Sequence, residues 1–300
     1  MKYHGNQDFR GGGHFSGRLT VMTCTAGFIA LQYLKTLGIE VFAHIYNIGG
    51  VCDTPFDPVF PKKSENDFPV LSQAAGEKMR LIMENAKKDG DSAGGVIECA
   101  VTGLRPGLGE HMFRSVEAAV SEAVFSVPAV KGVEFGAGFS GATLRGSAFN
   151  DAYQIQNGKI TTKSNNNGGI LGGMTNGMPV IFRVFIKPVP SIAKPQPTVD
   201  LSTMKNTVIS ISGRHDACIV PRAVPVIEAA AGLAIADLLS EEPRETVELN
   251  DLRRKIDIID SEMVALLCSR MEISKKTAGQ RVLPGLLYQD SVFSPKKLTA

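Results

Sequence analysis

Several features are missing from this sequence, and each absence excludes a class of protein. No stretch approaches the roughly eighteen consecutive apolar residues that a membrane-spanning helix needs. Residues 1–13 are polar and rich in glycine, so they do not resemble a secretory signal peptide. The 32 basic and 30 acidic residues give a formal net charge of +2, which does not favour nucleic acid or an anionic membrane as a partner. We therefore expect a soluble cytoplasmic protein that binds neither.

Paired cysteines are also absent. The five cysteines lie far apart and include no CxxC pair, which argues against a disulfide framework or a zinc ribbon. We accordingly expect no metal site. Hydrophobic residues make up 43% of the chain and charged residues 21%, proportions that are typical of a globular protein with a substantial core.

Helical and extended patterns alternate along most of the chain, which predicts an α/β or α+β protein. Residues 51–70 contain four prolines and are predicted to form a loop or flap. We interpret His4, His44 and His111 as surface or packing histidines. Apolar spacing predicts helices over 17–37, 72–89, 109–125 and 222–239, and strands over 39–48, 96–102, 130–135, 179–186 and 207–212.

The composition changes near residue 240. We predict a main domain over 1–240, an acidic linker over 241–248 and a separate helical segment over 249–300. From Leu249 to Leu267 the apolar residues recur every three or four positions, and the run as far as Ala278 would form one amphipathic helix about 45 Å long. Its apolar stripe needs a partner, either the main domain or another chain.

Two kinds of segment could carry chemistry. Glycine pairs in loops, such as 168–169 and 172–173, let backbone N–H groups approach a ligand, although any single pair could also be a plain tight turn. None matches a P-loop or a dinucleotide-binding fingerprint. In 213–218, Arg214 could bind an anion and Asp216 could handle a proton. The alternative is that these two side chains form an ion pair or cap a turn.

Taken together, these segments resemble chorismate synthase. The stretch 163–177 (KSNNNGGILGGMTNG) is similar to the glycine loop of that family, and 187–191 (KPVPS) and 213–218 (GRHDAC) follow at the family's spacing. The resemblance covers residues 1 to about 240. Further matching segments are 8–13, 89–95, 107–110, 128–134 and 221–228.

The resemblance implies an α+β fold, a β-α-β sandwich followed here by the long C-terminal helix, and a homotetramer. It also implies reduced FMN as cofactor and 5-enolpyruvylshikimate 3-phosphate as substrate, from which a 1,4-anti elimination of phosphate gives chorismate. It leaves open whether NADPH reduces the flavin on the enzyme or another enzyme supplies it reduced. No nucleic acid or membrane partner is implied.

Residue by residue, the resemblance implies a set of flavin contacts and one catalytic acid. Asp216 would handle protons together with the flavin. Lys187 and Arg214 would offset the negative charge of reduced flavin and phosphate. The flavin contacts would be His14, Phe15, Ser16, Pro128, Ala129, Gly172, Lys187, Pro188, Val189, Pro190, Ser191 and Arg214.

This sequence departs from the family's pattern in its first part. The Gly-Glu-Ser-His-Gly and Arg-Pro-Gly-His-Ala-Asp segments, with the family's two catalytic histidines, are not found in it, and His14 and Phe15 replace Arg and Ser. Loss of a general acid typically reduces the rate by about 10²–10⁴-fold. We therefore expect an N-terminally shortened synthase core. The alternative is an impaired remnant that retains flavin binding or oligomerisation.

The C-terminal helix is similar to the first helix of the all-helical chorismate mutases, through 252–260 (LRRKIDIID) and 265–270 (ALLCSR). That resemblance implies that Arg253, Arg270 and Arg281 bind the carboxylates of chorismate. The alternative is that Arg253 and Asp257 form an ordinary surface pair, worth about 0.3–0.5 kcal/mol.

Overall fold

The computed structural model describes residues 3, 6, 10–156, 158–213, 215–241 and 249–280. The chain divides into two compact units, residues 1–242 and 243–300. The first unit combines a five-stranded antiparallel sheet with packed helices, so the predicted α+β class is confirmed.

The sheet has the order β2-β1-β3-β9-β4, with neighbours antiparallel throughout. The strand predicted over 39–48 is confirmed: Ala43 and Ile45 face the main core, whereas Phe42 belongs to a second cluster on the other face. The strands are β1 (Glu40–Ile48), β2 (Val51–Cys52), β3 (Gly95–Thr102), β4 (Val130–Phe135) and β9 (Val180–Ile186).

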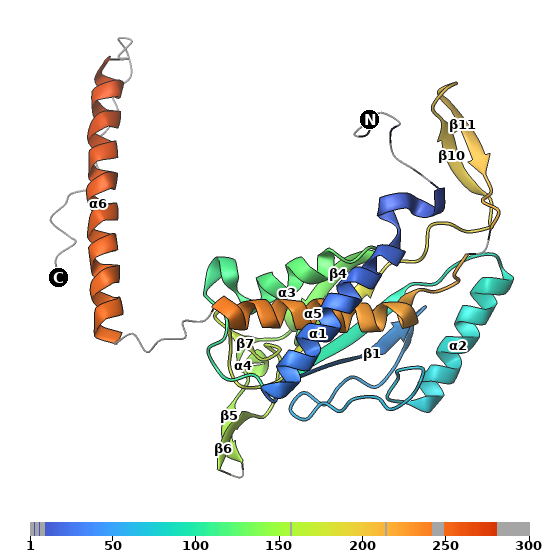
Figure 1. Cartoon of the computed structure of the whole chain (residues 1–300), viewed down its shortest axis with the longest axis horizontal. Helices are drawn as coiled ribbons and strands as arrows, with labels where there is room; N and C mark the ends of the chain where they lie inside the picture. The colour runs from blue at the N-terminus through green and yellow to red at the C-terminus, as the bar shows by residue number, and fades with distance from the viewer. Residues whose placement is uncertain are drawn as a thin grey trace. The chain divides into compact units, whose positions relative to one another are not determined.

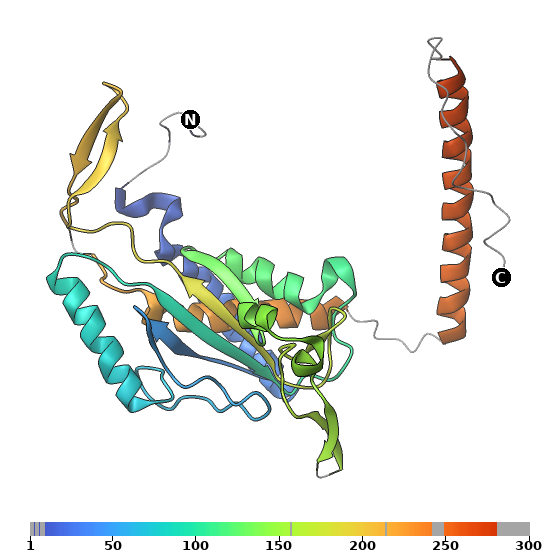
Figure 2. The ribbon, with the colours of Figure 1, turned by 180° about the vertical axis from the view of Figure 1, so that it is seen from behind.

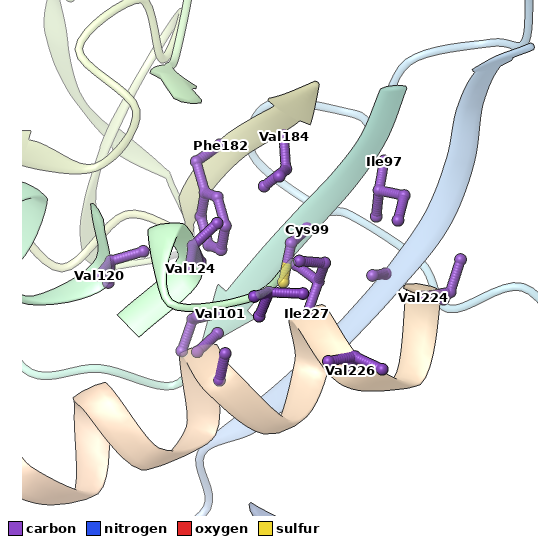
Figure 3. Close-up of a cluster of buried hydrophobic side chains, with 14 of the residues drawn as sticks. Ile97, Cys99, Val101, Val120, Val124, Phe182, Val184, Val224, Val226 and Ile227 are labelled. Carbon is purple, nitrogen blue, oxygen red and sulfur yellow. The ribbon is translucent and has the colours of Figure 1, made fainter. Parts of the chain in front are cut away.

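Helices cover one face of this sheet, in front of it in Figure 1 and behind it in Figure 2. They are α1 (Thr20–Thr36), α3 (Val116–Phe125) and α5 (Val220–Glu241), while α2 (Gln73–Lys88) contacts β1 and β2. Figure 3 shows Ile97, Cys99 and Val101 of β3 against side chains of α5. Of the described helices, α5 alone is long and apolar enough to span a membrane, and its burial marks it as the core helix of this unit.

Glycine allows α1 and α5 to cross closely. A Cβ on Gly27 would collide with the backbone and Cβ of Ala229, and one on Gly232 would lie 2.7 Å from Leu31 Cδ2. The opposite face of α1 exposes a group of large apolar side chains, Val21, Met22, Phe28, Ile29 and Tyr33. A second large sheet, which the sandwich implies, is not among the described residues.

The other described elements are short. Three two-stranded hairpins are β5 (Tyr153–Gln156) with β6 (Lys159–Thr162), β7 (Ile170–Leu171) with β8 (Met174–Thr175), and β10 (Gln196–Asp200) with β11 (Lys205–Ile209). The remaining turns are η1 (Arg10–Phe15), η2 (Gly17–Leu19), η3 (Met112–Arg114), η4 (Gly138–Thr143) and α4 (Gly146–Phe149).

Several predicted boundaries were wrong. The helix predicted over 109–125 begins only at Val116, because Met112 has a φ of 64° and Ser115 caps a new helix through Ala118 N. The strand predicted over 207–212 ends at Ile209, and its partner β10 was missed. α5 begins at Val220, two residues before the predicted start at residue 222. It continues through Pro225, although proline has no backbone N–H to donate.

The second unit contains α6 (Leu249–Gln280), which confirms that the apolar spacing forms a helix. Its described side chains are exposed along the whole length, including Leu252, Ile256, Ile259, Met263 and Leu266.

Candidate active site

Two of the predicted flavin segments meet where the chain leaves β9. Lys187 N donates a hydrogen bond of 2.9 Å to the carbonyl of Ala129, just before β4. Ala129 has a φ of 76°, a conformation that costs free energy for a residue with a Cβ and is most often found at functional sites. The contact fixes Pro128 and Ala129 beside the start of the 187–191 segment.

The turn at residues 89–95 joins this cluster from the other side. Ser92 Oγ donates to the carbonyl of Val189 at 2.7 Å. A Cβ on Gly94 would lie 2.6 Å from the carbonyl oxygen of Ile186 and 2.9 Å from the nitrogen of Pro188, so only glycine lets this turn approach. The backbone of the 187–191 segment is therefore held from two directions.

Asp216 is held next to the same turn. Ala93 N donates 2.8 Å to the carbonyl of Ala217, which fixes the neighbouring backbone. The carboxylate of Asp216 pairs with Arg222 Nη1 at 2.8 Å, and both side chains are well exposed to solvent. The ion pair thus involves Arg222; Arg214 lies outside the described residues. His215 is half-buried, and its Nε2 has no hydrogen-bond partner among the described residues.

His14, Phe15 and Ser16 precede α1. The rings of His14 and Phe15 lie 4.2 Å apart, and the ring of Phe15 is 60% exposed. Ser16 caps the short turn η2, where Ser16 Oγ accepts from Arg18 N at 3.3 Å. In Figure 1 these turns lie toward the same end of the unit as the chain that follows β9.

Gly172 does not lie with the other predicted flavin contacts. It is in the tight β7–β8 turn, whose Gly173 carbonyl accepts from Val116 N at the start of α3. Pro128 follows the other end of α3, a helix about 15 Å long. β9 likewise separates the two regions by about 20 Å. Figure 1 shows β7 at the opposite end of the unit from η1.

Comparisons with known proteins identify the family of this chain. The family profile described as chorismate synthase matches residues 1–239. The chorismate synthase of Korarchaeum cryptofilum is 46% identical over 249 residues, which are 82% of this chain and 69% of that protein. That of Dehalococcoides mccartyi (strain ATCC BAA-2100) is 48% identical over 79% of this chain and 66% of that protein.

The chain belongs to the chorismate synthase family. A crystal structure of a chorismate synthase aligns with a TM-score of 0.63 and 26% identity, covering 82% of this chain and 70% of that one. The chain thus spans about two thirds of the length of the curated relatives it matches. Chorismate synthases are lyases of aromatic amino-acid biosynthesis that depend on reduced FMN.

The residues at the end of β9 have the chemistry that a reduced flavin phosphate requires. Lys187 supplies a positive charge, and Phe15, which precedes α1, supplies an exposed ring. Gly172 also has open space around its Cα, but it belongs to the other end of β9. The described residues therefore fit a flavin at one end of the sheet.

A buried charged network, which the sequence did not predict, lies on the other face of the sheet. His44 Nδ1 is 3.1 Å from Asp53 Oδ2, and His44 Nε2 is 3.0 Å from Glu98 Oε2. All three side chains are at most 1% exposed. Arg183 Nε donates 2.8 Å to Glu98 Oε1, and Arg183 Nη1 is 3.5 Å from Glu134 Oε1. His44 is thus a buried network residue rather than a surface histidine.

Hydrogen bonding keeps Glu98 ionised in this buried position. Burial opposes its negative charge, but His44, the N–H of Phe56 and the nearby Arg183 together lower the pKa of Glu98 below its ordinary value. The sequence did contain a signal, since Glu98 and Arg183 are single charged residues in otherwise apolar strands. Such residues are rarely buried unless they are paired.

The mutase-like arginines are not brought together. Arg253 and Arg270 are both exposed on α6 and lie about 25 Å apart along its axis. One chorismate could not contact both on a single helix. Arg281 lies outside the described residues, and the family profile ends before α6.

Proposed function

We propose that this chain contributes the flavin-binding part of a chorismate synthase-type lyase, which eliminates phosphate from 5-enolpyruvylshikimate 3-phosphate to give chorismate. The observation that carries the proposal is the cluster at the end of β9, where Lys187 is fixed to Ala129 and the 89–95 turn holds Val189. Family membership supports both the reaction and the cofactor.

In this proposal each group has a defined task. Reduced FMN supplies the electron-rich ring on which the elimination depends. Lys187, with Arg214 as predicted, places positive charge near the phosphates, and the backbone at Pro128–Ala129 and 187–191 positions the ring. Asp216 handles a proton, and this requires that its carboxylate leave Arg222, to which it is paired at 2.8 Å. The exposure of both partners makes that exchange inexpensive.

We further infer a homo-oligomer, as predicted, and a cytoplasmic location. The exposed face of α1 and the projecting hairpins carry exposed apolar side chains such as Phe28, Ile155 and Leu201. These surfaces, together with the sheet edges, support assembly into a homo-oligomer. The proposal that NADPH reduces the flavin rests on the family resemblance alone.

Anaerobic titration with reduced FMN tests the binding half of this proposal. Lys187→Ala should weaken binding about 10-fold, because one charge-assisted contact to an anion is worth about 1.5–3 kcal/mol and solvent screens part of it. Lys78→Ala, at an exposed position on α2, is the matched control and should bind as the unchanged protein does. Failure of a folded chain to bind reduced FMN would overturn the proposal.

Turnover separates the lyase from its alternative. Release of phosphate from 5-enolpyruvylshikimate 3-phosphate, lost on Asp216→Asn, would establish the lyase. Flavin binding without phosphate release would favour the impaired remnant. The mutase prediction stays a prediction, and it requires prephenate formation that disappears on Arg253→Ala.

A further inference from the structure

The loop at residues 53–72, called the flap here, is tied to the sheet through the buried network. Its first residue, Asp53, accepts hydrogen bonds from Leu71 N at 2.5 Å and Ser72 N at 2.8 Å, which closes the loop at its base. Glu98 Oε2 accepts from Phe56 N at 2.6 Å, which ties the flap to β3. His44 lies between these two carboxylates and contacts both.

The hydrogen-bond partners of His44 favour one protonation state of its ring. Each ring nitrogen faces a carboxylate oxygen, and each of those oxygens also accepts from a backbone N–H of the flap. Two acceptors facing one imidazole are satisfied only when both ring nitrogens carry a proton. A neutral ring would direct a lone pair at a buried carboxylate, which is strongly unfavourable in an apolar environment.

The surrounding side chains support a cation at this position. Glu98 is shared with Arg183, whose guanidinium stacks 4.3 Å from the ring centre of Tyr46 and also approaches Glu134. Three carboxylates therefore face two cations when His44 is protonated, and only one when it is neutral. The ring of Phe56 covers His44 at 4.4 Å and excludes water.

The flap in turn contacts the asparagine–glycine loop at residues 163–177. Asn165 Nδ2 donates to the carbonyl of Pro58 in the flap at 3.0 Å and to that of Pro179 at 2.8 Å. Asn165 is only 6% exposed, so this contact is internal. A displaced flap would remove one of the two contacts that hold the Asn165 side chain.

We propose that His44, as an imidazolium between Asp53 and Glu98, is a positioning residue that latches the flap and thereby supports the 163–177 loop. Removal of its ring releases the flap. The latch is independent of the proposed function.

Limited digestion with trypsin measures the latch, because Lys62 and Lys63 are exposed in the flap. His44→Gln should be cut there at least about 10-fold faster than the unchanged protein near pH 6. The matched control is His111→Gln, at an exposed histidine, which should be cut at the unchanged rate. Equal rates for His44→Gln and the unchanged protein would overturn the latch.

A measurement on the unchanged protein guards against variants that fail to fold. The ¹⁵N chemical shifts of His44 near pH 6 should be those of an imidazolium, and a neutral tautomer would overturn the proposal. If the unchanged protein binds no flavin, the proposed function fails, while digestion and NMR still decide the latch.

Discussion

The carboxylate of Asp151 is the clearest single support of the asparagine–glycine loop, and its replacement is predicted to destabilise the fold. Asp151 Oδ1 accepts from Ser164 Oγ and Asn166 N, both at 2.7 Å. Asp151 Oδ2 accepts from Asn167 N at 2.9 Å and Asn167 Nδ2 at 2.8 Å. The residue is 9% exposed. Four donors therefore converge on one buried anion.

Asp151→Asn keeps the shape but replaces one acceptor oxygen with an N–H₂ group that faces donors. At least two of the four bonds are lost, and hydrogen bonds to a charged group are worth about 1.5–3 kcal/mol each. After partial relaxation we expect the free energy of unfolding to fall by about 3 kcal/mol. With a urea m-value of about 2 kcal/mol/M, the midpoint should fall by about 1.5 M.

The effect should depend on pH in a defined direction. Burial raises the pKa of Asp151, but the bonds from Asn167, Ser164 and Asn166 lower it further than burial raises it. Because the folded pKa is lowered, the stabilisation is present above the unfolded value of about 3.9 and is lost as pH falls through the folded value. The difference between the two proteins should therefore be full at pH 7 and shrink below about pH 4.

Asp257→Asn, at an exposed position on α6, is the control and should change stability by less than about 0.5 kcal/mol. Urea unfolding at neutral and acidic pH gives both comparisons. If Asp151→Asn is as stable as the unchanged protein at pH 7, or if its deficit persists undiminished in acid, the carboxylate does not support the loop as argued.

Two further predictions concern α1 and α5, helices that cover one face of the sheet. Gly27→Ala should lower the free energy of unfolding by about 1–3 kcal/mol, because its Cβ would collide with α5. Gly17→Ala is the control: its Cβ would meet nothing within 4 Å, so the loss should be less than about 0.5 kcal/mol. Thermal unfolding of both variants tests this. Glu228 accepts from Ala43 N at 2.8 Å, and burial raises the pKa of its carboxyl. A raised folded pKa penalises the ionised form, so Glu228→Gln should match or exceed the unchanged stability at pH 7. Urea unfolding should show that advantage shrinking as pH falls toward 5, and a constant difference would contradict the assignment.

The sequence predicted the main strands because their signals are local. The alternation in 39–48 and the apolar runs around Val101 and Val184 directly reflect burial against one layer of helices. The helix over 109–125 was mispredicted because apolar spacing does not reveal the positive φ of Met112. β10 was missed because Pro197 argues against a strand, yet this proline is tolerated in a two-stranded hairpin with free edges.

The site was predictable only as far as its motifs are contiguous. The segments 187–191 and 128–134 are recognisable one at a time, but their contact through Lys187 N and the Ala129 carbonyl depends on the pairing of β4 with β9. The His44 network depends on the registers of four strands, since His44 pairs with Glu98, Glu98 with Arg183 and Arg183 with Glu134. No local pattern encodes such a register, although single charges in apolar strands indicate where to look.

The predicted flavin residues depend on three different supports in the fold. The 187–191 segment is held by Ala129 and Ser92, and the His14–Ser16 turn by its position before α1. Gly172 depends instead on the contact of Gly173 with the start of α3. Loops held at the ends of rigid elements can change sequence without altering the core, whereas their anchoring bonds cannot. This explains why the family's motifs are separate, short segments spread over the chain. It also explains why glycines stand at their contacts, where a Cβ would collide with the neighbouring segment.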